Sequence, residues 1–135
     1  MRLFLLNVLL LIGIIGYPQY KEGNGIDFLN EKTFNHKVNN NRTLTVVEFY
    51  AEWNAYNQCN YLKRLKDCKV YRVNIDDEIN LKREFDVKVV PTLIIFDGGK
   101  VKAKYEANLM FQATGKFSYE GVQEKIDEII LNKFK

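Results

Sequence analysis

The residues with the most chemical potential lie in one short segment. Trp53 is followed by two asparagines, Asn54 and Asn57, that are three residues apart. A carboxamide donates and accepts hydrogen bonds, but it cannot exchange disulfides, because the attacking species in that reaction is a thiolate. The two amides could bind a ligand by hydrogen bonds. For Asn54 we favour a helix cap, because Asn is among the best N-cap residues.

The chain contains two cysteines, Cys59 and Cys68. A reactive cysteine needs exposure and a stabilised thiolate, whereas Cys59 shares a helical spacing with Leu62 and Leu65, which favours a buried structural residue. The alternative is a lone nucleophile at Cys59, for glutathione-type exchange or peroxide reduction. A helix over residues 54–66 would separate the two cysteines by roughly 12 Å or more. We therefore expect no disulfide, which requires Cα atoms within about 7 Å.

Glu48 is a carboxylate inside the apolar run from Leu44 to Tyr50. That run is typical of a central strand covered on both faces. A buried carboxylate is costly unless it is paired or protonated. We expect Glu48 to be a structural group that is hydrogen-bonded to a nearby lysine, to Asn57 or to water.

Composition argues against several other functions. His36 is the only histidine, and no Cys/His spacing typical of a metal site and no phosphate-binding loop is present. The 20 basic and 17 acidic side chains are interspersed, which predicts a mixed solvated surface rather than a nucleic-acid interface. We predict no metal, no cofactor and no nucleic-acid partner.

The 135 residues are enough for one domain with a real core. Arg2 followed by the apolar run 3–16 is typical of a secretory signal peptide. We predict a signal peptide over residues 1–16, a linker over 17–25 and one domain over 26–135, in a periplasmic or secreted protein. An uncleaved anchor or a buried N-terminal helix is the alternative, and an uncleaved signal would be the only contact with a membrane.

Hydrophobic periodicity predicts an α/β domain, with a mixed central sheet and helices on both faces. Strands are expected over residues 26–29, 44–50, 69–75, 91–96 and 101–107. Helices are expected to begin after Asn30, at Asn54, at Ile79 and after Ser118. Asp97-Gly98-Gly99 predicts a hairpin turn. The connection over residues 108–117 contains an exposed-looking set, Leu109, Met110 and Phe111.

Three motifs together resemble the thioredoxin-like superfamily. Residues 46–57 are similar to the strand and Trp-Cys-x-x-Cys turn of thioredoxins, with Asn in place of both cysteines. Val90-Pro91-Thr92 resembles the cis-proline turn, and Glu48 takes the place of the buried carboxylate. The chain is also similar to small thioredoxin-family proteins of Bacteroidetes that lack the cysteine pair. The resemblance implies a thioredoxin fold.

Together with the absent cysteine pair and the signal-like run over residues 3–16, the resemblance leads us to predict a redox-inactive protein of the cell envelope that binds another protein or an extended peptide. In such a fold a cis bond before Pro91 would turn the Val90 backbone outward, where it could pair with a peptide by strand addition. The predicted binding residues are Trp53, Asn54, Asn57, Val90, Pro91 and Thr92. Two alternatives stay open: a single-thiol oxidoreductase that uses Cys59, and a structural subunit of an envelope complex that docks through residues 109–111.

Overall fold

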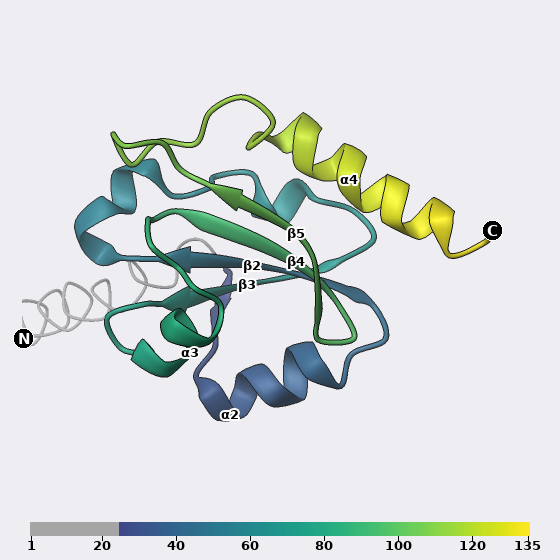
Figure 1. Ribbon diagram of the computed structural model, residues 1–135, viewed down its shortest axis with the longest axis horizontal. Helices are drawn as coiled ribbons and strands as arrows, with labels where there is room; N and C mark the ends of the chain where they lie inside the picture. Colours follow the sequence, from purple (N-terminus) through teal and green to yellow (C-terminus); the bar gives the residue numbers. More distant parts are fainter. Residues whose placement is uncertain (1–24) are drawn as a thin grey trace, which may run out of the picture.

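The computed structural model describes residues 25–135, so the predicted signal peptide over 1–16 and the linker up to residue 24 lie outside the described residues. The described chain forms a five-stranded sheet in the order β1-β3-β2-β4-β5 (Figure 1). The parallel part consists of β1 (Asp27–Phe28), β3 (Lys69–Asn74) and β2 (Leu44–Tyr50). The antiparallel part adds β4 (Thr92–Asp97) and β5 (Lys100–Glu106). Every predicted strand is present within one residue of its expected bounds.

Helices cover both faces of this mixed sheet. In Figure 1, α2 (Glu31–Phe34) and α3 (Ile79–Glu84) lie on one side, and α4 (Tyr119–Asn132) lies on the other. A π-helical segment, η1 (Asn35–Asn39), extends α2. Two of the predicted caps are present: the side chain of Asn30 accepts from the Thr33 N–H, and that of Ser118 accepts from the Gly121 N–H. Within residues 25–135, no helix is long and apolar enough to cross a membrane.

Two hydrophobic cores result, one on each face, because successive side chains of a strand point to opposite faces. Phe34, Val47, Phe49 and Phe96 belong to the core under α2 and α3. Val46, Leu93, Ile95 and Ile126 belong to the core under α4. Glu48 is two residues from Val46, so its side chain points to the same face of the sheet, toward the core under α4. Cys59 lies in that same core.

The helix predicted over residues 54–66 is wrong. The segment instead forms two short 3-10 helices, η2 (Glu52–Asn57) and η3 (Leu62–Arg64). Gln58 is extended, with ψ of 153°, and it ends η2. The Asn, Tyr and Cys residues of this segment have only modest helix propensity. The decisive reason lies in the backbone contacts of Cys59.

Candidate functional site

A buried ion pair joins the two central parallel strands. Glu48 on β2 and Arg72 on β3 are register partners, so their side chains emerge next to each other on one face of the sheet. Arg72 Nε donates to Glu48 Oε1 at 2.8 Å, and the side chains are 3% and 0% exposed. The partner of Glu48 is therefore Arg72, and not the lysine, Asn57 or water that the sequence led us to expect.

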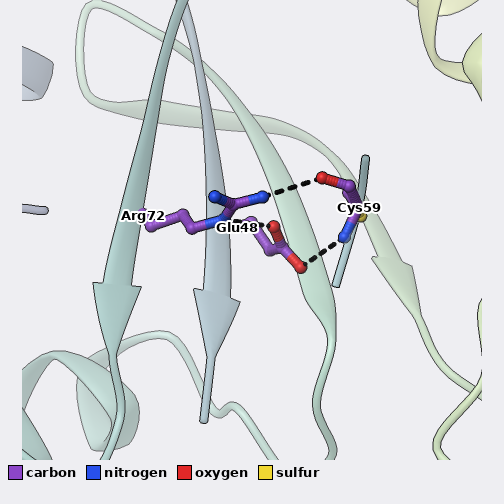
Figure 2. Close-up of polar contacts among 3 residues, drawn as sticks. All are labelled: Glu48, Cys59 and Arg72. Atoms are coloured by element: carbon purple, nitrogen blue, oxygen red, sulfur yellow. Dashed lines mark hydrogen bonds and ion pairs between the residues drawn. The ribbon is translucent and has the colours of Figure 1, made fainter. Parts of the chain in front are cut away.

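The ion pair also binds both backbone groups of Cys59, its N–H and its carbonyl (Figure 2). The Cys59 N–H donates to Glu48 Oε2 at 2.8 Å, and Arg72 Nη2 donates to the Cys59 carbonyl at 2.8 Å. An α-helix would need both groups for bonds to residues four positions away. The contact with the ion pair thus replaces helical pairing at Cys59, and this accounts for the two short turns around it.

The ion pair makes Glu48 a structural group. Burial raises the pKa of Glu48 above its ordinary value, and the charge and hydrogen bond of Arg72 act in the opposite direction. Both carboxylate oxygens already accept a hydrogen bond, one from Arg72 and one from Cys59. Each oxygen of Glu48 thus has a partner inside the protein.

The thiol of Cys59 is poorly suited to nucleophilic chemistry. Cys59 is 4% exposed. Burial raises the pKa of its thiol strongly, and the negative charge of Glu48 raises it further. Cys68 is half-buried, and burial together with Asp67 raises its pKa to about 11. Both cysteines are free thiols. At neutral pH each is held in the protonated form, which does not attack disulfides.

Asn54 does not cap a helix, because the N-cap position of η2 is Ala51. The amide of Asn54 instead reaches across the fold. Its Nδ2 donates to the Val90 carbonyl at 3.0 Å and to the Phe111 carbonyl at 3.2 Å. Its Oδ1 accepts from Asn57 Nδ2 at 2.8 Å. The two asparagines thus form a hydrogen-bonded pair that connects three segments of the chain.

The peptide bond between Val90 and Pro91 is cis. The Val90 backbone, which we expected to be open, is closed: the residue is 2% exposed and its carbonyl is bonded to Asn54. Pro91 and Thr92 are also buried. Of the six predicted binding residues, Trp53 is exposed, Asn54 and Asn57 are half-buried, and the other three are buried.

A loop over residues 108–112 packs next to η2. The Trp53 and Phe111 rings meet edge to face, with centroids 5.2 Å apart. Five large side chains of η2 and this loop are solvent-exposed, and we call them the tip surface: Trp53, Tyr56, Leu109, Met110 and Phe111. Sequence reasoning identified all of these except Tyr56. Tyr56 lies on η2 and is fully exposed.

A pocket of about 380 Å³ lies between the end of η2 and residues 112–117. Its polar lining is uncharged and consists of Asn57, Gln58, Asn60, Gln112 and Thr114, with Cys59 and Tyr61 among the remaining wall residues. Residues 25–135 contain no group of three potential metal-ligating side chains. The site therefore offers hydrogen bonds and apolar contacts rather than charges or metal ligands.

The sequence model of the Thioredoxin family matches residues 25–114. The chain belongs to the thioredoxin family. This match includes β1 to β5, η2 and the loop over residues 108–112. Helix α4 lies beyond the matched residues.

Several known proteins are similar to the chain. A protein disulfide-isomerase A6 homologue of Drosophila melanogaster is 28% identical over 93% of this chain, and the match covers 31% of that protein. A protein disulfide-isomerase like 2-2 of Arabidopsis thaliana is 28% identical over 70% of the chain and 23% of its own length. A thioredoxin of Rickettsia felis is 29% identical over 55% of the chain and 77% of its own length. The chain thus spans about a third or less of the two isomerases.

Among solved structures, the crystal structure of a designed protein superposes with a TM-score of 0.62 at 15% identity. The match covers 78% of this chain and 97% of that one. At this identity the likeness concerns the fold alone, and it agrees with the thioredoxin-type α/β sheet.

Replacing Arg72 with Met should lower the free energy of unfolding by about 3–5 kcal/mol, because the substitution leaves Glu48 as a buried charge without a partner. Urea unfolding followed by circular dichroism measures the change. The double variant Glu48→Gln/Arg72→Met should lose clearly less, because it removes the charge and keeps an acceptor for the Cys59 N–H. Lys102→Met, an exposed change on β5, is the control and should stay within about 0.5 kcal/mol.

The loss in free energy of unfolding caused by Arg72→Met should depend on pH. Without Arg72, the folded-state pKa of Glu48 rises further above its ordinary value of 4.5. A carboxyl group whose pKa is higher in the folded protein loses stability as the pH rises above its unfolded-state pKa. The difference from wild type should therefore be largest near neutral pH and shrink toward the ordinary glutamate pKa. A pH-independent difference would contradict the buried-charge explanation.

Cys59 should react slowly with Ellman's reagent in the native protein at about pH 8, because a buried thiol with a raised pKa supplies little thiolate. The Cys68→Ser variant isolates this thiol for the measurement. The same sample in denaturing guanidinium chloride should react completely. Native Cys59 that reacts as fast as free glutathione would contradict its burial and support the single-thiol alternative.

Proposed function

We propose that this member of the thioredoxin family is a redox-inactive protein of the cell envelope that binds another protein through its tip surface. The observation that carries the proposal is the state of Asn54 and Asn57. Asn57 donates to Asn54, and Asn54 donates to the carbonyls of Val90 and Phe111. The positions that carry thiols in redox thioredoxins here make structural hydrogen bonds.

The composition of the tip surface supports a protein partner. Residues 53–62 and 107–115 contain no charged side chain, although 27% of the whole sequence is charged. Tyr56, Leu109 and Met110 are 103%, 96% and 72% exposed. Depletion of charge together with Trp, Tyr, Phe and Met is the compositional signal of the core of protein interfaces. A partner with an uncharged, apolar face fits this surface.

The closed Val90 backbone favours docking through side chains over pairing with an extended peptide. Strand addition uses free backbone groups, and the Val90 carbonyl is already bonded to Asn54. A role as a structural subunit of an envelope complex uses the same tip surface and differs only in how permanent the complex is. The envelope location is supported by the leader-like run over residues 3–16.

The protein should not accelerate the reduction of insulin disulfides by dithiothreitol. Residues 54 and 57 carry no thiol, and the thiol of Cys59 is buried and protonated. Turbidity of the released insulin B chain measures the rate, and a thioredoxin with its cysteine pair is the positive control. A rate clearly above the dithiothreitol background that disappears in Cys59→Ser would overturn redox inactivity and establish the single-thiol alternative.

The double substitution Leu109→Ser/Met110→Ser should abolish capture of a stoichiometric partner. The purified protein is coupled to beads and exposed to an envelope extract of the source organism, and the partner is then tested as a pure protein by size-exclusion chromatography. Both side chains are exposed, so the variant should keep the stability of the wild type in urea. Leu131→Ser, which removes an exposed leucine on α4, is the matched control and should leave capture unchanged. Equal capture by all three proteins would refute the tip surface as the docking site.

A further inference from the structure

Asn54 joins two segments that are far apart in the sequence. Its Nδ2 bonds the carbonyls of Val90 and Phe111, which are 36 and 57 residues away. An amide nitrogen carries two hydrogens, so both are used. The bond from Asn57 to Asn54 Oδ1 fixes the direction in which the amide faces. Both donor hydrogens of Asn54 thus connect the loop over residues 108–112 to the turn before β4.

The loop itself is a small, internally bonded unit. Asn108 Oδ1 accepts from the N–H groups of Met110 and Gln112 at 2.9 and 3.0 Å. The Asn108 N–H donates to the Gln112 carbonyl at 2.9 Å, and the Phe111 N–H donates to the Asn108 carbonyl at 3.0 Å. Residues 108–112 are all exposed. The loop therefore has its own internal structure. Its base is held by the bond from the Ala107 N–H to the Pro91 carbonyl at 3.1 Å, and its tip is held by the contacts with η2.

Phe111 adopts a backbone conformation that is unfavourable for its type. Its φ is +59°, in the left-handed region that bulky residues rarely occupy. The residue keeps this conformation while its carbonyl is bonded to Asn54 and its ring contacts Trp53. These two contacts offset the unfavourable backbone, so loss of the Asn54 amide should favour release of the loop.

We propose that Asn54 and Asn57 form a latch that keeps loop 108–112 closed over the Val90–Pro91 turn. The Val90 carbonyl precedes β4, whose ladder with β2 begins at Thr92, so the latch occupies an acceptor that the sheet leaves free. The latch also holds Phe111 beside Trp53, which completes the tip surface. That the latch contributes to partner binding rests on the proposed function. That the latch keeps the loop closed does not depend on that function.

The latch requires a carboxamide at residue 54. Two carbonyl oxygens must be bonded while a hydrogen bond from Asn57 is accepted, and a carboxamide supplies both the two N–H donors and the acceptor oxygen. A thiol has one weak donor, and a carboxylate of the same shape has none. Asn54→Asp therefore keeps the size of the side chain and removes the latch, while Asn57→Ala removes only the bond that orients it.

Hydrogen exchange measured by mass spectrometry tests the latch on the full chain. Peptides covering residues 108–112 should exchange about tenfold faster in Asn54→Asp and Asn54→Ala than in wild type, because the bridge from the Phe111 carbonyl of the loop through Asn54 to the Val90 carbonyl is lost. Asn57→Ala should give an intermediate increase. Asn60→Ala, an exposed change in the same segment, is the control and should give none. In peptides from β2, the exchange rate should rise by no more than the loss in free energy of unfolding, measured in urea, accounts for.

Trp53 supplies a second readout, because it is the only tryptophan in the sequence. If the loop lifts without losing its internal bonds, exchange stays slow but the Trp53–Phe111 contact breaks. The Trp53 emission and its quenching by acrylamide should then change in the Asn54 variants and not in Asn60→Ala. Unchanged exchange together with unchanged Trp53 emission in both Asn54 variants would overturn the latch. Both readouts use the isolated chain, so a failed capture of a partner would refute the proposed function and leave the latch unaffected.

Discussion

The buried pair of Glu48 and Arg72 is the interaction on which the arrangement of the site depends. An ion pair out of water gains little net stability, because desolvation offsets most of the Coulomb attraction. Its effect here is geometric. The pair takes up the N–H and the carbonyl of Cys59, and the chain after β2 then crosses the sheet in short turns. These turns place Asn54 within reach of Val90 and Phe111.

The strands could be predicted because their signals are local. Alternating or continuous β-branched runs and a glycine hairpin turn act over a few residues, and every strand was predicted within one residue of its bounds. The polar caps at Asn30 and Ser118 are equally local. The helix over residues 54–66 was predicted on the same kind of local spacing, from Cys59, Leu62 and Leu65. It fails because a tertiary contact takes the hydrogen-bonding groups that helix formation needs, and local spacing carries no information about that contact.

A signal for the ion pair was nevertheless present. Arg72 is a charged residue within an apolar strand. It is two residues from Val70, which packs against the core under α4, so both side chains point to the same face of the sheet. A second charge of opposite sign, Glu48, interrupts the neighbouring strand. Two opposite charges on the same face of adjacent central strands are best explained as a pair. The role of Asn54 had no comparable signal, because its partners at Val90 and Phe111 are backbone carbonyls, which every residue possesses.

Three features around Asn54 and Asn57 favour the proposal of a redox-inactive site. A reactive thiolate is stabilised at the N-terminus of a helix, and here residues 54–57 belong to a short 3-10 turn instead. A carboxylate that transfers protons needs a free oxygen, and both oxygens of Glu48 are bonded. A substrate needs an open backbone edge, and the Val90 carbonyl is occupied. The absence of thiols at residues 54 and 57 would not by itself produce any of these three features. Their agreement argues that the segment is organised as a stable, uncharged surface, which supports a binding role over a vacant redox centre.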